Sequence, residues 1–213
     1  MDEPLSGPEL GRSARKRRDI IEAAQTVFVR EGYEGTTMDE IAALAQVSKQ
    51  TVYKNFEDKE QLFTEIIMSS ISAAEKLSAG LVPELPTSAD VEADLRKFAR
   101  QHIVVVMQPH LVRMRRMIIG AADRFPSLAR RWYERGPQQA HITLAGRFEE
   151  LARRGLLQVP DPLLAAEVFN WLILSIPMNK AMFYADDEPF PASELERCAD
   201  EAVRVFLAAY GPS

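Results

Sequence analysis

The sequence predicts an all-α protein. Apolar residues recur at intervals of three and four through most of its length, as they do in helices with one buried side. Capping residues, glycines and prolines divide these segments into helical lengths, and no useful stretch alternates apolar and polar residues as a strand would. The 213 residues are 46% hydrophobic and 27% charged, which is enough for one large or two modest folded domains.

The first helical segment begins in a basic run. Arginine or lysine occupies residue 12 and residues 15–18, after a stretch that is rich in Pro, Gly and Ser. Two interpretations stay open, a mobile basic arm and the solvated start of a helix. Ile20, Ala24 and Phe28 then follow helical spacing, so we expect a helix over 13–31 that stops at Gly32.

Three helices are expected next. Thr37 with Glu40 three residues later is a capping box, which predicts a short helix that ends near 45 or 46. Ser48 caps a third helix over 49–55, with Val52 on its inner side and Gln50, Tyr53 and Lys54 on its outer side. A fourth helix opens at the capping box of Asp58 and Gln61 and continues to about 79.

A stretch rich in helix breakers, 80–90, separates these helices from the rest. Further helices are expected at 90–107, 110–123, 126–154, 162–184 and 193–209. Gly136 followed by Pro137 should kink or split the third of these, and Pro177 should kink the fourth.

Two short helices with a tight turn and an exposed polar face are what a helix-turn-helix requires, although plain helical bundles also contain such pairs. The residues here also carry a resemblance. The sequence resembles the N-terminal signature of TetR-family transcriptional regulators over Ile20–Ala24 with Phe28, Gly32–Ala42, Val47–Phe56 and Asp58–Phe63. The run Phe125–Glu134 with Gly136 and Pro137 is similar to the AefR-like branch of that family. Gln50 is a departure, since many members have glycine there.

The resemblance implies an N-terminal arm at 1–12, a helix-turn-helix DNA-binding domain at 13–74, and a helical ligand-binding and dimerisation domain at 75–213. The expected function is a homodimeric regulator of transcription, a repressor that a small apolar ligand releases from double-stranded operator DNA. An alternative is an architectural or partner-regulated DNA-binding protein of the same fold without a small-molecule effector.

The resemblance also implies which residues contact DNA. Thr37, Tyr53, Lys54 and Lys59 match positions that contact the DNA backbone or the base edges. Additional contacts are expected from the start of the third helix and from the basic run, at Ser48, Lys49, Gln50, Thr51, Arg15 and Arg18. Gln50 is the candidate for direct base reading, because glutamine pairs with adenine through two hydrogen bonds.

The C-terminal helices supply two further sets of residues. Apolar residues with a few polar groups are expected to line an effector site, although ordinary core packing explains them equally well: Phe98, His102, Met114, Met117, Ile118, Trp132, Phe148 and Trp171. Apolar stripes on the last two helices are expected to form the dimer interface: Val168, Leu172, Leu195, Ala199, Ala202 and Phe206.

Other classes of function find little support. The histidines, His102, His110 and His141, have no second ligand at helical spacing, and no serine lies in a nucleophile elbow, so we expect no metal, no cofactor and no enzymatic activity. No apolar run approaches the roughly 20 residues of a membrane span. The N-terminus lacks the apolar centre of a secretory signal, and Cys198 is a single cysteine, so a cytoplasmic protein is expected.

Overall fold

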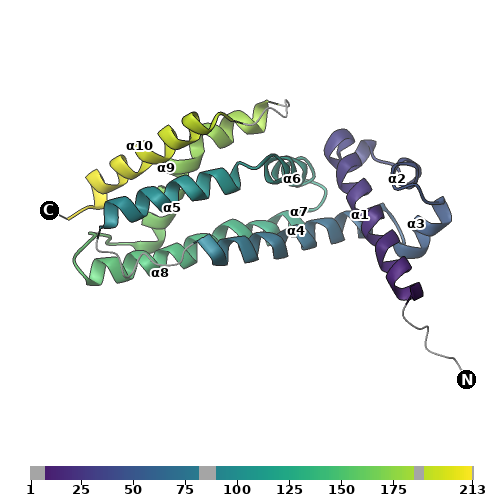
Figure 1. Ribbon diagram of the computed structural model, residues 1–213, viewed down its shortest axis with the longest axis horizontal. Helices are drawn as coiled ribbons and strands as arrows, with labels where there is room; N and C mark the ends of the chain where they lie inside the picture. Colours follow the sequence, from purple (N-terminus) through teal and green to yellow (C-terminus); the bar gives the residue numbers. More distant parts are fainter. Residues whose placement is uncertain (1–7, 82–89, 185–189, 213) are drawn as a thin grey trace, which may run out of the picture. The chain divides into compact units, whose positions relative to one another are not determined.

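The computed structural model describes residues 8–81, 90–184 and 190–212, with side chains described in 13–71, 90–184 and 190–212. All regular structure in these ranges is helical, which confirms the expected all-α class (Figure 1). The helices are α1 (Pro8–Gly35), α2 (Met38–Leu44), α3 (Lys49–Asn55), α4 (Lys59–Leu81), α5 (Val91–Val106), α6 (Pro109–Gly120), α7 (Pro126–Tyr133), α8 (Gln139–Arg153), α9 (Pro162–Phe183) and α10 (Ala192–Tyr210). None of the described helices is both long and apolar enough to cross a membrane.

The chain divides into two compact units. We call the first the N-terminal unit; its described residues are 8–70 and 117–129. The second, the C-terminal unit, contains the described residues of 71–116 and those from 130 onward. The division after residue 70 lies close to the boundary expected at 74. The assignment of 117–129 to the N-terminal unit differs from the contiguous domains expected from the sequence.

The core of the N-terminal unit is an aromatic cluster. Phe28 at the end of α1 packs edge-to-face on Phe63 of α4, with ring centroids 5.0 Å apart, and Tyr33 packs on Phe63 at the same distance. Phe125, from the connection between α6 and α7, packs on Tyr33 at 4.7 Å. The segment 117–129 is therefore held in the N-terminal unit by aromatic packing, and the local sequence pattern does not predict this contact.

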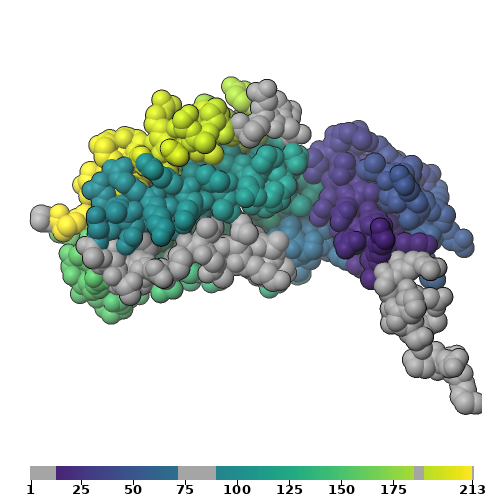
Figure 2. All heavy atoms as spheres, viewed as in Figure 1, coloured from purple at the N-terminus to yellow at the C-terminus, as the bar shows by residue number. Residues whose placement is uncertain are grey.

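The C-terminal unit is built on α5, α8, α9 and α10. In the space-filling view α10 (yellow) lies directly against α5 (teal) (Figure 2). Phe148 of α8, Phe169 of α9 and Phe206 of α10 meet in its core, with centroids 4.6 to 5.7 Å apart. All three side chains are fully buried, so this cluster fixes how the three helices pack.

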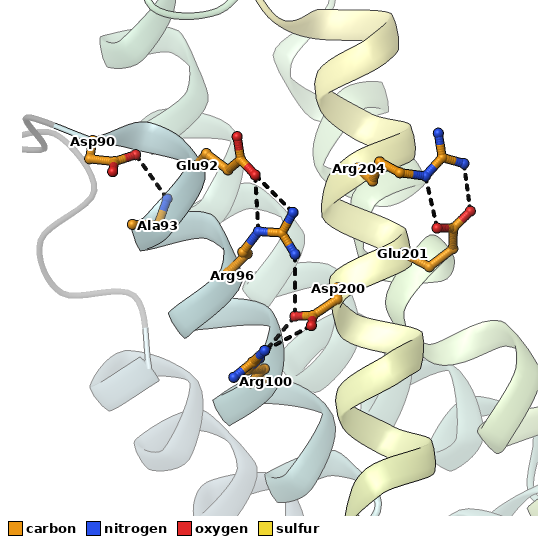
Figure 3. A network of polar contacts seen from close by, with 8 residues as sticks. All are labelled: Asp90, Glu92, Ala93, Arg96, Arg100, Asp200, Glu201 and Arg204. Carbon is orange, nitrogen blue, oxygen red and sulfur yellow. Dashed lines mark hydrogen bonds and ion pairs between the residues drawn. The ribbon is translucent and has the colours of Figure 1, made fainter.

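Ion pairs join α5 to α10 at the surface (Figure 3). Asp200 accepts two hydrogen bonds from the Arg100 guanidinium, at 2.9 and 2.7 Å, and lies 3.6 Å from Arg96. Arg96 also donates to Glu92 in the same helix. The Arg100 hydrogen bonds hold the pKa of Asp200 below its ordinary value.

The two prolines expected to disturb helices act differently. Between α7 and α8 the chain forms a π-helical turn over Glu134–Gln138 that contains Pro137. Proline has no N–H to donate to the preceding turn, which favours such a widened turn. By contrast, α9 continues as one helix through Pro177, which is buried.

Candidate functional site

The first candidate site is the exposed side of α3. Its bounds, Lys49–Asn55, agree with those expected from the sequence. The Ser48 side chain accepts the N–H of Thr51 at 3.2 Å and caps the helix as expected. Val52 is fully buried and Phe56, just after the helix, is nearly so, which fixes the inner side of α3. The outer side is left free to meet a partner.

Polar side chains gather on that outer side. Ser48, Lys49, Gln50, Tyr53 and Lys54 are all exposed, and Thr51 is half-buried beside them. Lys49 Nζ lies 2.7 Å from the carboxylate of Asp39 in α2, and this pair raises the pKa of Lys49. The result is a short helix whose free surface consists of hydrogen-bonding groups, the kind of surface that reads base edges and phosphates in a major groove.

The turn that joins α2 to α3 holds the two helices in a fixed relation. Gln46 in this turn has φ 54°, in the left-handed region, and is the one residue other than glycine in the described ranges with a positive φ. The Val47 N–H donates to Ala42 O at 3.1 Å and closes the turn. At the other end of α2, the exposed Thr37 accepts the Glu40 N–H at 3.2 Å, which confirms the expected cap.

The Lys59 side chain makes contacts within the folded chain. Its ammonium group donates to the carbonyl oxygens of Tyr33 at 2.7 Å, Thr36 at 2.9 Å and Glu34 at 3.4 Å. It also lies 4.5 Å from the centre of the Tyr33 ring. These carbonyls follow Gly32, whose φ of 69° and ψ of 176° interrupt α1. The ammonium group that was expected to contact phosphate is therefore already surrounded by backbone acceptors.

The basic run belongs to a helix. Since α1 begins at Pro8, the structure supports the second of the two interpretations left open, and the expected arm overlaps the helix over 8–12. Arg15 and Arg18 are exposed on α1, with Arg18 3.7 Å from Glu22. Arg17 pairs with Glu65 of α4 and stacks on the Phe56 ring.

The second candidate site is a group of buried and half-buried polar side chains in the C-terminal unit that interact electrostatically or by hydrogen bonds, which we call the polar cluster: His102, Arg115, His141 and Asn170, one each from α5, α6, α8 and α9. His102 Nε2 lies 2.9 Å from Asn170 Oδ1, and the imidazole stacks on Phe98 at 5.4 Å. The Arg115 guanidinium lies 5.3 Å from the centre of the Trp132 ring.

His141 is the most enclosed member of the polar cluster. It is 3% exposed, and its Nδ1 has no hydrogen-bond partner among the described residues. The carboxylate of Glu167 lies 4.0 Å from Nδ1, beyond hydrogen-bond reach. Burial lowers the pKa of His141 and outweighs the opposing effect of Glu167, so the imidazole is neutral at pH 7. Nowhere in the described part of the chain do three metal-ligating side chains come together.

The expected effector residues are scattered. Phe98 and Phe148 are buried in the core of the C-terminal unit, whereas Trp171 is 43% exposed. Met117 and Ile118 are buried and belong to the N-terminal unit. His102 and Trp132 lie in or against the polar cluster, and Met114, next to Arg115 in the sequence, is half-buried. The sequence interpretation missed three members, Arg115, His141 and Asn170, because no local spacing links them.

The α10 residues expected at the dimer interface pack inside one chain. Leu195, Ala199, Ala202 and Phe206 are buried in the core of one chain, with exposed fractions of 6, 0, 2 and 0%. Their side chains serve the core of one chain, and a contact of α10 with a second chain stays a prediction. On α9, Val168 and Leu172 are half-buried, and Leu164 and Trp171 are exposed.

Comparisons with known proteins agree with this architecture. Residues 20–66 match the model of the tetR family of bacterial regulatory proteins, and residues 93–212 match the C-terminal domain of AefR-like transcriptional repressors. A solved TetR-family regulator from Mesorhizobium loti is 46% identical, with a TM-score of 0.81, over 94% of this chain and 98% of its own. The solved flavonoid-responsive regulator FrrA is 33% identical, with a TM-score of 0.68, over 93% of this chain and 98% of its own.

Curated relatives match mainly in the N-terminal part. The Bacillus subtilis regulator YhgD is 38% identical over 84 residues, which are 39% of this chain and 44% of that protein. The Escherichia coli acrEF/envCD operon repressor is 31% identical over 94 residues, which are 44% of this chain and 40% of that protein. The chain thus spans less than half the length of either relative.

Proposed function

Because the chain belongs to the TetR family of bacterial transcriptional regulators, we propose that it is a homodimeric repressor released from operator DNA by a small, largely apolar ligand. The observation that carries the proposal is α3. Its inner side is anchored by Val52 and Phe56, and its outer side consists of exposed polar groups. A helix presented in this way fits the major groove.

The proposed DNA contacts divide by chemistry. Gln50 reads a base edge, because its amide both donates and accepts a hydrogen bond and matches adenine. Lys54, Tyr53 and Ser48 hold the DNA backbone or neighbouring edges, and Thr51 supports them from the same helix. The exposed hydroxyl of Thr37 and the arginines of α1, Arg15 and Arg18, extend the contact to phosphates on either side.

Lys49 and Lys59 have different parts in this proposal. Lys49 is exposed, and its pairing with Asp39 is a surface contact that a phosphate can replace. Lys59 instead holds the connection between α1 and α2 through three carbonyl oxygens. It therefore contributes to DNA binding by fixing where α2 begins.

A dimer is needed to place two copies of α3 in successive major grooves. We propose that α9 supplies the contact through Leu164, Val168 and Trp171, which follow helical spacing and lie on one side. Leu164 is 52% exposed and Trp171 is 43% exposed. Apolar side chains of this size, exposed in a row, are typical of a surface that another chain covers.

Release by a ligand is supported by the polar cluster in the C-terminal unit and by relatives. FrrA is named a flavonoid-responsive regulator, and the acrEF/envCD relative is named a repressor. A ligand acts in this way only if it binds the DNA-free conformation more tightly than the DNA-bound one.

The test is fluorescence anisotropy with labelled DNA from the region upstream of the coding sequence. We expect the wild-type protein to bind a palindrome there, and Tyr53→Phe and Lys54→Ala to weaken binding without changing the circular dichroism spectrum. Lys97→Ala, which removes a lysine from α5 in the C-terminal unit, is the matched control. Specific binding that no member of a hydrophobic compound library reverses would favour the alternative regulator without an effector.

A further inference from the structure

The polar cluster has more donors than acceptors. Arg115 contributes five N–H donors, yet within the part of the chain that the structure describes it makes only the contact with the Trp132 ring. Its side chain is partly buried, and this burial lowers its pKa. A guanidinium that is partly removed from water gains from a carboxylate partner. Among the described residues, no carboxylate pairs with this cation.

The neighbouring groups do not supply the missing negative charge. His102 and His141 are both neutral at pH 7, because burial lowers the pKa of each. The Glu167 carboxylate is 4.0 Å from His141 Nδ1, is 38% exposed, and has no ion pair with Arg115 among the described residues. Arg115 is the one charged member of the polar cluster.

His141 provides an independent sign that a group is missing. A ring nitrogen in a side chain that is 3% exposed is expected to have a hydrogen-bond partner, and Nδ1 has none among the described residues. His141 follows the π-helical turn at Glu134–Gln138, and Trp132 precedes it. Such turns often mark functional sites, because they change the direction in which neighbouring side chains point.

The surroundings of these donors are flat and aromatic. Phe98 stacks on His102 with the two ring planes 10° apart, and Trp132 lies under Arg115. His102, Arg115 and Trp132 each keep part of their surface accessible, whereas His141 is closed off. The half-buried Arg115 and Trp132 thus lie together, whereas Phe98 is a core residue that stacks on both His102 and Phe169.

We propose that the polar cluster binds an aromatic carboxylate, with Arg115 holding the carboxylate, His141 donating to a ligand oxygen, and Trp132 packing against the ring. Arginine suits this role because its planar fork matches the two carboxylate oxygens. This assignment deepens the proposed function, on which its regulatory meaning rests, by naming the class of effector.

The test is isothermal titration calorimetry of the full-length protein with 2-naphthoate and with 2-naphthamide, which has the same shape but no charge. We expect the wild type to bind the carboxylate at least about tenfold more tightly than the amide, as a charge-assisted hydrogen bond predicts. Arg115→Gln should bring the two affinities together, and Arg115→Lys should retain part of the preference. The matched control is Arg131→Gln, which removes an exposed arginine next to Trp132.

Three results would overturn the assignment: equal affinities in the wild type, no measurable binding of 2-naphthoate at about 1 mM, or a preference that survives Arg115→Gln. The comparison of two ligands on the wild type keeps the test decisive even where a variant folds poorly.

Anisotropy with operator DNA in the same samples separates this assignment from the proposed function. If 2-naphthoate binds in a way that depends on Arg115 but does not release DNA, the carboxylate site is supported and regulation through it is contradicted. If other apolar compounds release DNA equally from the wild type and from Arg115→Gln, the carboxylate site is contradicted and the proposed repressor function is still supported.

Discussion

Replacing Lys59 with methionine separates two roles for this side chain. Methionine keeps most of the length and the apolar stem but removes the ammonium group. Lost with it are the hydrogen bonds to three backbone carbonyls, at 2.7, 2.9 and 3.4 Å, and the contact 4.5 Å from the Tyr33 ring. The carbonyls that remain stand at the end of α1 without their cation.

The magnitude follows from these contacts. A hydrogen bond from a charged group contributes about 1.5–3 kcal/mol, and the half-buried ammonium makes two short ones, so solvent will replace only part of the loss. We expect Lys59→Met to lower the free energy of unfolding by about 2–3 kcal/mol. For a chain of this length that corresponds to a fall in Tm of about 5–10 °C.

Thermal and urea unfolding followed by circular dichroism measure this effect, and anisotropy measures DNA binding. Lys54→Met is the control, because Lys54 is exposed on α3 and should change DNA affinity but not stability. If Lys59→Met kept its Tm within about 1 °C and lost operator binding as Lys54→Met does, the carbonyl contacts would be energetically unimportant. Lys59 would then act by contacting phosphate.

Three further changes follow from the structure. Asp39→Asn removes a carboxylate beside α3 and frees Lys49, so it should raise affinity for nonspecific DNA several-fold at low salt, and an unchanged affinity in anisotropy titrations would contradict this. Asp200→Asn should lower the Tm by about 1–3 °C at pH 7. Because Arg100 depresses the pKa of Asp200 in the folded state, the difference should be complete above about pH 4 and shrink as the pH falls further; a difference that does not shrink on acidification would have another origin. Trp171→Glu should give monomers in light scattering with weakened operator binding, whereas dimers at micromolar concentration would place the interface elsewhere.

The sequence by itself determined the local structure of the DNA-binding region. The caps at Thr37 and Ser48 and the bounds of α3 were predictable, because a cap joins groups three residues apart and a helix shows its buried side in its own spacing. For the same reason the exposed polar side of α3 follows from the spacing of its own residues. The resemblance to TetR-family regulators extended this local information to function.

The tertiary structure decided which apolar and charged surfaces meet. Periodicity showed that α10 has an apolar stripe but not that the core of the same chain covers Phe206. It gave no sign that Phe125 packs on Tyr33, or that His102 pairs with Asn170, 68 residues away. The role of Lys59 was equally ambiguous in the sequence, since a lysine ammonium group can donate hydrogen bonds either to DNA phosphates or to backbone carbonyl oxygens. Helical spacing records that a side is buried, whereas its partner depends on how distant helices pack, and that information is not local.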